Sequence, residues 1–121
     1  KDWAILIAET LKYIGTLCVE FFIDRNDNLY VNEIAPRVHN SGHLTINAYN
    51  VSQFENHVRA VCSLKQVAIK KIYNAEMINL IGDQIIPYRK NPKLNDNQFI
   101  FDYRKKDIKE KRKMGHLTTL K

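Results

Sequence analysis

The N-terminal part of the chain changes from a helical hydrophobic period to a strand-like one. Large apolar side chains recur at helical spacing over residues 2–14, and Gly15 follows directly, so we predict an amphipathic helix that ends there. Strand-forming residues then alternate over 16–24. A second such run covers 29–35, after the polar residues 25–28. The pattern therefore predicts a helix followed by a β-hairpin.

The hairpin leads into a polar loop and a second helix. Pro36 ends the second predicted strand, because proline has no amide proton to donate to a neighbouring strand. Residues 37–45 are polar and predict a loop. The run 52–55 (SQFE) has the spacing of a capping box and predicts the start of a helix, which ends near 63–64. Its apolar stripe is Phe54, Val58, Val61 and Cys62.

The rest of the chain consists of short apolar runs separated by polar loops. Residues 65–75 have no periodicity and predict a connection into a second lobe. Prolines and the polar stretch 90–97 argue against a long helix in that lobe. We expect three short strands there, at 76–81, 98–103 and 115–120. The sequence thus predicts an α/β (α+β) fold with two units, residues 1–70 and residues 71–121.

Composition narrows the class of protein. The 121 residues are 45% hydrophobic and 26% charged, which fits one globular domain or two small lobes. No apolar run approaches the roughly 18 residues that cross a membrane, and no signal segment is present, so we expect a cytoplasmic protein without a membrane partner. The chain opens without an initiator Met, which favours a fragment of a longer protein. Cys18 and Cys62 are expected to be reduced thiols in the core, and no Cys–His spacing indicates zinc.

The net charge of +6 is concentrated in the C-terminal third. Residues 1–84 carry 8 Lys/Arg and 9 Asp/Glu, a balance of −1, whereas residues 85–121 carry 11 and 4, a balance of +7. Residues 104–113 alone hold seven Lys/Arg. Three aromatic residues at alternate positions precede them: Phe99, Phe101 and Tyr103. Such a segment could bind an anion or single-stranded nucleic acid, or form a solvated face, although alternating aromatics are more simply the core of the lobe.

Two glutamates are predicted to face each other across the hairpin. If Asp24 closes the turn opposite Leu29, then Glu20 lies directly opposite Glu33. Like charges at such positions, about 4.5–5.5 Å apart, destabilise a hairpin. A bound Mg²⁺ would explain them, and so would a pair of carboxylates used in acid–base chemistry. A register error of one residue, or an ion pair between Glu33 and Arg37, would remove the conflict instead.

A dense group of polar side chains follows the strand that carries Glu33. Five of them fall within seven residues: Arg37, His39, Asn40, Ser41 and His43. This concentration of donors beside a possible metal site indicates a binding or catalytic loop, and Gly42 would let the backbone approach a ligand closely. The alternative is a hydrogen-bonded surface loop.

Residues 31–43 (VNEIAPRVHNSGH) resemble the N5-carboxyaminoimidazole ribonucleotide synthetase family of ATP-grasp enzymes. The same family is matched by four other segments, 19–22 (VEFF), 52–55 (SQFE), 79–82 (NLIG) and 112–116 (RKMGH). The resemblance implies the C-terminal half of an ATP-grasp domain followed by a small β-rich C-terminal domain.

The resemblance also implies an activity. The family carboxylates 5-aminoimidazole ribonucleotide with ATP and bicarbonate, through carboxyphosphate, and releases ADP and phosphate in de novo purine biosynthesis. It implies ATP and Mg²⁺ as cofactors, bicarbonate as co-substrate, small-molecule substrates rather than nucleic acid, and a homodimer of the full-length protein. This chain alone is expected to be inactive, because the family's ATP-clamping lysines lie outside it. A basic nucleic-acid-binding module and a non-catalytic ATP-grasp remnant are the alternatives.

Residue by residue, the resemblance assigns the hairpin and the loop to the reacting groups. Glu20 and Glu33 match the family's Mg²⁺ ligands, and Asn32 with Glu33 matches its nucleotide-binding pair. Arg37 matches the residue that steadies bicarbonate or carboxyphosphate, a role that suits a planar and permanently charged guanidinium. His39 and Asn40 match residues around the imidazole substrate.

The resemblance assigns cations of the basic segment 104–113, here called the basic tail, to the substrate's phosphate. Lys105 and Arg112 match the two cations that hold the ribose phosphate in the family. Arg104 stands where the family has glycine, and Lys106 follows Lys105, so either lysine could take the phosphate role. Leu44 stands where an aromatic residue commonly follows the loop, which leaves the site assignment unchanged.

Overall fold

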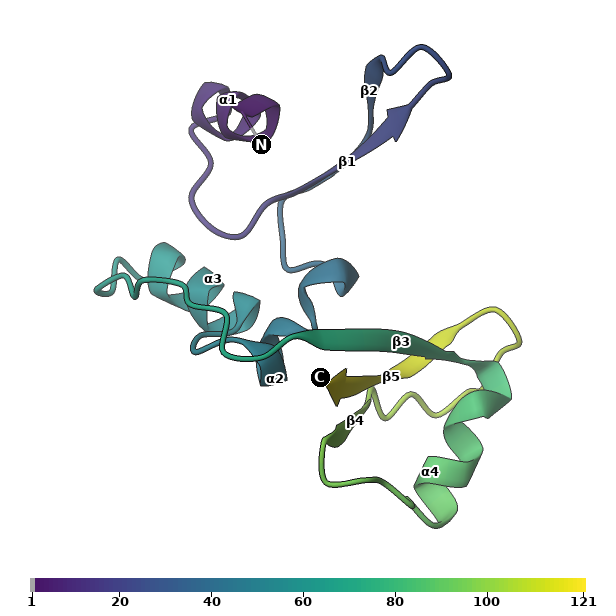
Figure 1. The fold of residues 1–121 in the computed structure, drawn as a ribbon. Helices are drawn as coiled ribbons and strands as arrows, with labels where there is room; N and C mark the ends of the chain where they lie inside the picture. Colours follow the sequence, from purple (N-terminus) through teal and green to yellow (C-terminus); the bar gives the residue numbers. More distant parts are fainter. Residues whose placement is uncertain (1) are drawn as a thin grey trace.

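The computed structural model describes residues 2–121, in which short helices surround two separate sheets (Figure 1). The N-terminal elements are α1 (Asp2–Thr10), β1 (Cys18–Ile23), β2 (Leu29–Ala35), the 3-10 turn η1 (Asn40–Gly42), α2 (Thr45–Ala48) and α3 (Gln53–Val61). The C-terminal elements are β3 (Ala75–Ile81), the 3-10 turn η2 (Gly82–Ile85), α4 (Ile86–Lys90), β4 (Gln98–Asp102) and β5 (Lys113–Leu120). The predicted α/β (α+β) class is confirmed.

The hairpin turn is built around the side chain of Asp24. Its Oδ1 accepts hydrogen bonds from the backbone amides of Asn26, at 2.8 Å, and Asn28, at 2.9 Å. Hydrogen bonds from Asn28 hold the pKa of this carboxyl below its usual range. Because Asp24 is used in the turn, Ile23 pairs with Leu29, and the predicted pairing of Asp24 with Leu29 is wrong.

A β-bulge restores the predicted pairing further along the hairpin. Glu20 does lie opposite Glu33, while the next residue, Phe21, pairs with Val31. Asn32 is therefore the extra residue of the bulge, and two residues of β2 oppose one residue of β1. From this position, Asn32 Nδ2 donates a hydrogen bond to Oε2 of Glu20 at 3.3 Å.

The two longer helices are shorter and more exposed than their patterns predict. α1 ends at Thr10 because the chain turns at Lys12, whose φ of 49° is left-handed. α3 is capped as predicted at its N-terminus, where Ser52 Oγ accepts from the amide of Glu55 at 3.1 Å. The carboxylate of Glu55 is bound by Arg59 at 2.7 Å, so the reciprocal half of the capping box is replaced by an ion pair. The stripe along α3 is not buried by the described residues, and Val58 remains 52% exposed.

The C-terminal sheet has the strand order β3-β5-β4 and is antiparallel throughout. Leu80, Ile85 and Met114 form its buried core, and α4 supplies two of the partly buried side chains around them. From β4 it is Ile100 that packs against this core, whereas Phe101 is 49% exposed. The prediction that the alternating aromatics form the core is therefore wrong for Phe99 and Phe101, because η2 and α4 cover the opposite face.

Residues 65–75 connect the two parts by running back past α2. The backbone of Lys71 forms an isolated antiparallel β-bridge with Tyr49. The amide of Ile72 donates to the carbonyl of the fully buried Ala48 at 2.8 Å. The predicted connection is therefore held to the N-terminal part before β3 begins. The division of the chain into residues 1–70 and 71–121 stays a prediction.

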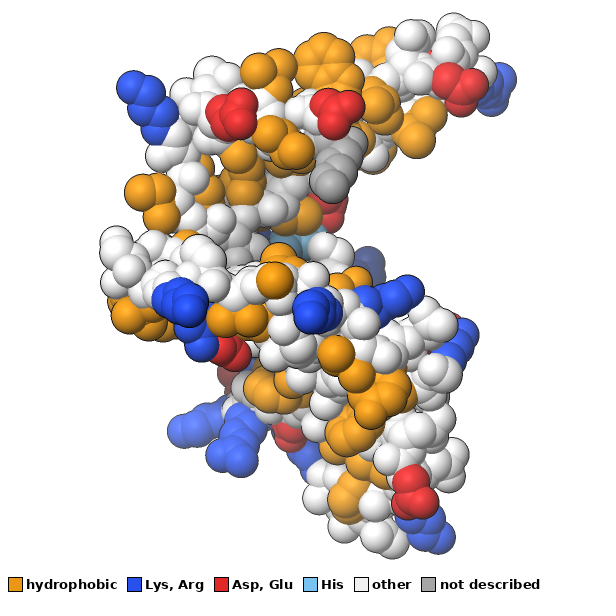
Figure 2. All heavy atoms as spheres, turned by 60° about the vertical axis from the view of Figure 1, so that its left-hand side comes forward, with side chains coloured by type: hydrophobic (Ala, Val, Ile, Leu, Met, Phe, Trp, Pro, Cys, Tyr) orange, Lys and Arg blue, Asp and Glu red, His pale blue; other side chains and the backbone are white. Residues whose placement is uncertain are grey.

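Figure 1 places α1 and the hairpin at one end, the C-terminal sheet with α4 at the other, and α2, α3 and the loop between them. In Figure 2 the molecule is hollowed between these two ends, with histidine side chains at the inner end of the hollow and basic side chains along its lower edge. None of the helices described over residues 2–121 has the length and apolar character to span a membrane. Cys18 is half-buried and Cys62 is exposed, both as free thiols, so the expectation of two core cysteines is wrong for Cys62, which lies just past α3.

Candidate functional site

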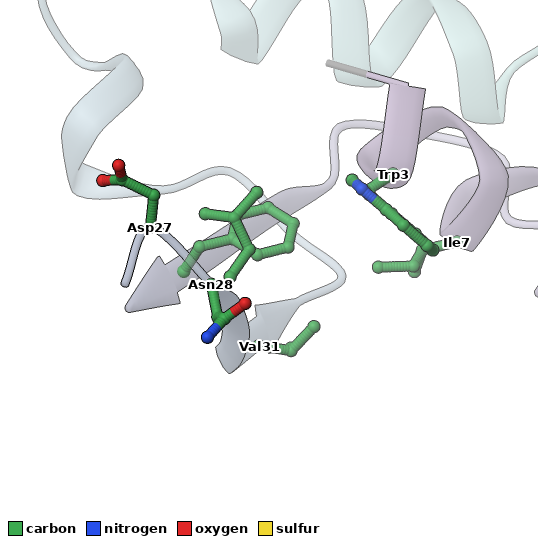
Figure 3. Close-up of a pocket in the computed structure, with 7 residues that line it drawn as sticks. Trp3, Ile7, Asp27, Asn28 and Val31 are labelled. Carbon is green, nitrogen blue, oxygen red and sulfur yellow. The ribbon is translucent and has the colours of Figure 1, made fainter. Parts of the chain in front are cut away.

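A pocket of about 420 Å³ separates α1 from the hairpin, away from the polar loop. Figure 3 shows Trp3 and Ile7 of α1 on one side of it, with Asp27, Asn28 and Val31 of the hairpin on the other. No residue of α1 is buried. The pocket is thus an incompletely filled junction between a helix and a sheet, and it contains none of the predicted site residues.

The loop that follows β2 contacts the hairpin through the side chain of His39. Its Nε2 lies 3.4 Å from Oε1 of Glu20. On the other side of the ring, Nδ1 lies 2.9 Å from Ser41 Oγ and accepts a longer bond, 3.4 Å, from the Ser41 amide. His39 is the N-cap of η1, so the turn itself sets the direction of the imidazole. The structure therefore brings together two predicted site residues, Glu20 and His39.

Gln53, the first residue of α3, holds the loop in this shape. Its Oε1 accepts from the amide of His39 at 2.9 Å, and its Nε2 donates to the carbonyl of His39 and to Nδ1 of His43, both at 2.7 Å. A Cβ on Gly42 would lie 2.5 Å from Gln53 Oε1. The backbone of Gly42 therefore makes its close approach to the side chain of Gln53. Sequence reasoning treated Gln53 only as part of a helix start and missed this role.

Asn40 joins the loop to the C-terminal sheet. Its Nδ2 donates to Asn79 Oδ1 on β3 at 2.8 Å, and more weakly to the hydroxyl of Tyr103 at 3.5 Å. Its Oδ1 accepts from Lys113 Nζ at 3.2 Å. Three segments remote in sequence thus meet at one amide side chain. Lys113 was not predicted as a site residue, although it lies inside the family-like run 112–116.

A cluster of rings supports this junction from the inside. His43 stacks on Phe54 at 5.3 Å and lies 5.3 Å from His116, whose own Nδ1 is 3.0 Å from the Tyr103 hydroxyl. His116 is 1% exposed, and burial lowers its pKa to about 4, with His43 adding to the effect. Burial also lowers the pKa of His43 and raises that of Tyr103. Because burial disfavours the charged form, both histidines are neutral at pH 7.

The carboxylate of Glu33, which lies opposite Glu20 in the hairpin, is paired with Arg37. Arg37 Nη2 lies 3.7 Å from Glu33 Oε1, while Nη1 donates to the carbonyl of Val38 at 2.9 Å. The ion pair that was the alternative to a metal is therefore present, between two exposed side chains. Even so, the hairpin offers the carboxylates of Glu20 and Glu33 and the amide of Asn32 at one bulge. Mg²⁺ takes oxygen ligands of this kind, so the donor set fits it.

Of the predicted phosphate ligands, Lys105 is the one directed at the junction. Its Nζ donates to the carbonyl of Lys113 at 2.7 Å and lies 5.3 Å from the ring centroid of Tyr103. Lys106 is exposed. The guanidinium of Arg112 is turned into its own loop, where it donates to the carbonyl of Asp107 at 3.3 Å. The side chains of Lys105 and Lys106 therefore have different surroundings, and the role of either at a phosphate stays a prediction.

Comparison with known proteins agrees with this architecture. The family model of the ATP-grasp domain matches residues 1–54, and that of the phosphoribosylaminoimidazole carboxylase C-terminal domain matches residues 75–121. The N5-carboxyaminoimidazole ribonucleotide synthase of Bacillus subtilis (strain 168) is 42% identical over 120 residues. The fold and these matches define part of an ATP-grasp protein. The chain belongs to the N5-carboxyaminoimidazole ribonucleotide synthase family, as the resemblance of residues 31–43 predicted.

Solved structures of the family share the fold. The Staphylococcus aureus enzyme complexed with ADP superposes with a TM-score of 0.87 at 40% identity, over 99% of this chain and 33% of its own. The Aspergillus clavatus enzyme in complex with ADP and 5-aminoimidazole ribonucleotide has a TM-score of 0.77 at 35% identity, over 88% and 30%. The Bacillus subtilis relative is matched over 99% of this chain and 32% of its own length. The chain thus spans about a third of its relatives.

Proposed function

We propose that the full-length protein containing this chain is an ATP-grasp ligase that carboxylates 5-aminoimidazole ribonucleotide. ATP and bicarbonate are consumed, and N5-carboxyaminoimidazole ribonucleotide, ADP and phosphate are formed, in de novo purine biosynthesis. Family membership supports this proposal, and so does the binding of ADP and 5-aminoimidazole ribonucleotide by the Aspergillus clavatus relative.

In this proposal the hairpin serves the nucleotide. Glu20 and Glu33 hold Mg²⁺, and Asn32 with Glu33 contacts ATP. Mg²⁺ there would neutralise charge on the phosphoryl oxygens during transfer. For Glu33 to take part, its carboxylate must leave Arg37, which is an exchange of one exposed ion pair at 3.7 Å. Arg37 is then released to bind the bicarbonate or carboxyphosphate anion.

The loop serves carboxyl transfer. A bicarbonate oxygen attacks the γ-phosphorus and ADP leaves; the amine nitrogen then attacks the carboxyl carbon, phosphate leaves, and the amine loses a proton. His39 and Asn40 lie around this centre. Of the two loop histidines, His39 is the one that faces the hairpin, with Nε2 3.4 Å from Glu20, whereas Nδ1 of His43 is bound by Gln53 at 2.7 Å. Lys105 and Arg112 hold the ribose phosphate.

The observation that carries the proposal is the junction at Asn40. Its contacts with Asn79 and Lys113 join the loop to the lobe that supplies Lys105. A ribonucleotide whose phosphate is held by the lobe would thereby present its imidazole to the loop. The engagement of Lys105 and Lys113 also supports a small-molecule substrate over nucleic acid as the role of the basic tail.

Further properties of the full-length protein belong to the same proposal. We place it in the cytoplasm as a homodimer that uses bicarbonate and Mg²⁺. We expect residues 1–121 alone to be inactive, since they represent about a third of the relatives' length.

The test is phosphate release from ATP by the full-length protein with bicarbonate, measured with and without 5-aminoimidazole ribonucleotide. We expect release stimulated by the ribonucleotide, and its collapse in Glu33→Gln. Glu76→Gln is the matched control, because Glu76 is an exposed glutamate of β3 paired with Lys121. A folded wild-type protein that shows no stimulation would falsify the proposal.

A further inference from the structure

Three side chains of different chemistry converge where β1 meets the loop. Cys18, Glu20 and His39 each place one ligand atom within 4.8 Å of the other two, and all three residues are half-buried. Cys18 and Glu20 are two residues apart on β1 and so lie on the same face of the strand. His39 reaches them from the loop, with Nε2 at 3.4 Å from Glu20. A thiol, a carboxylate and an imidazole therefore share one small site.

The hydroxyl of Ser41 orients this group. Ser41 Oγ lies 2.9 Å from Nδ1 of His39 and 3.9 Å from Sγ of Cys18. Metal binding at Nε2 requires the imidazole proton on Nδ1, where Ser41 Oγ is placed to accept it at 2.9 Å, and the longer bond of 3.4 Å from the Ser41 amide is then given up. A hydrogen bond on the far nitrogen is the usual companion of a histidine that ligates a metal, because it sets the tautomer and the ring direction.

We propose that Cys18, Glu20 and His39 form a three-ligand site for a thiophilic divalent cation of the zinc class. A thiolate and an imidazole select Zn²⁺ over Mg²⁺, which prefers oxygen ligands alone. Three protein ligands leave the fourth tetrahedral position open to water. This site differs from the Mg²⁺ set of Glu20 and Glu33 in using Cys18, which has no role in the proposed reaction.

The two sites compete for Glu20. A cation bound by Cys18, Glu20 and His39 takes the Glu20 carboxylate that the proposed Mg²⁺ site shares with Glu33, and it also occupies the His39 imidazole next to the carboxylation centre. Zinc therefore acts as an inhibitor of the enzyme, a consequence that rests on the proposed function, whereas the binding itself does not.

Binding is tested on the full-length reduced protein by titration with Co²⁺, which reports thiolate ligation through a charge-transfer absorption in the near ultraviolet. We expect one equivalent to bind with this absorption, displaced by Zn²⁺. Cys18→Ala should abolish it, and Cys62→Ala, which removes the exposed thiol beyond α3, should keep it. Ser41→Ala should weaken binding about tenfold. A folded wild type without the absorption, or a Cys18→Ala variant that retains it, overturns the proposal.

Inhibition is tested separately by titrating Zn²⁺ into the phosphate-release assay, with each variant normalised to its own zinc-free rate. We expect Cys18→Ala to need at least about tenfold more Zn²⁺ for half inhibition than wild type or Cys62→Ala. Equal sensitivity of all three would overturn the inhibitory role. A protein without ribonucleotide-stimulated activity would contradict the proposed function, while the Co²⁺ titration would still decide the metal site.

Discussion

The hydroxyl of Tyr103 lies 3.0 Å from Nδ1 of His116, inside the junction between the loop and the C-terminal sheet. Because Asn40 donates to the same hydroxyl, the Tyr103 proton is directed at the histidine, which must be neutral to accept it. A buried neutral histidine on the central strand thus supports the tyrosine over which Lys105 lies. This relationship makes the stability of the junction depend on pH.

His116 should destabilise the protein in mild acid. Its pKa is about 4 in the folded state against 6.5 normally, so below pH 6.5 the unfolded state binds the proton and the folded state does not. The free energy of unfolding should therefore be unaffected by His116 above pH 7 and should fall by up to about 3 kcal/mol as the pH drops from 6.5 towards 4. Urea titrations at several pH values measure this.

The matched variants are His116→Gln, which should flatten the pH dependence over this range, and Tyr103→Phe, which keeps the histidine and should retain it. If the free energy of unfolding fell equally with pH in wild type and His116→Gln, His116 would not be the group that destabilises the protein in acid.

Lys105 and Lys106 should differ in their effect on the ribonucleotide. Lys105 is turned towards Tyr103 and Lys113, whereas Lys106 is exposed. Loss of a charged hydrogen bond to phosphate is worth about 1.5–3 kcal/mol, so Lys105→Ala should raise KM for the ribonucleotide at least about tenfold. Lys106→Ala should leave KM nearly unchanged. Steady-state kinetics with ATP saturating provide the comparison, and the reverse order would exchange the two roles.

Lys113 should matter for turnover although the sequence did not single it out. Removing its amine in Lys113→Met deprives Asn40 Oδ1 of its donor at 3.2 Å and loosens the junction. We expect kcat to fall by roughly tenfold, which corresponds to about 1.4 kcal/mol. Lys111→Met, an exposed neighbour in the same loop, is the control. An equal loss in both variants would indicate a general effect of charge.

Gly42→Ala should disturb the loop through Gln53. The new Cβ would lie 2.5 Å from Gln53 Oε1, and the side chain that must move makes three hydrogen bonds to His39 and His43. We expect a loss of about 1–3 kcal/mol in the free energy of unfolding. The same substitution should cost clearly less in a Gln53→Ala background, because the clash is then absent. Additive losses would show that Gly42 acts elsewhere.

The local elements were largely predictable because their causes lie within a few residues. The cap at Ser52, the second strand of the hairpin and the short strands of the lobe follow from side-chain period, capping oxygens and turn residues. Even the facing pair Glu20 and Glu33 was predicted, although the turn around Asp24 and the bulge at Asn32 together produced it by a different register.

The apolar stripe of α3 shows a limit of such patterns. Its period predicts a buried face, but within residues 2–121 its members stay largely exposed, as does the apolar side of α1. Period indicates which residues can share a face, whereas burial depends on what packs against that face. The latter is a property of the tertiary structure.

By itself, the sequence determined the hairpin, the polar loop that follows it and the family to which the chain belongs. Only the tertiary structure decided that Asn40 meets Asn79 and Lys113, and that Cys18 meets His39. The physical reason is that a spacing along the chain constrains neighbours within one turn or one strand pair. Contacts between residues 39 or 73 positions apart depend on strand order, a bulge and loop hydrogen bonds acting together. The pattern of residue types along the chain does not specify that combined arrangement.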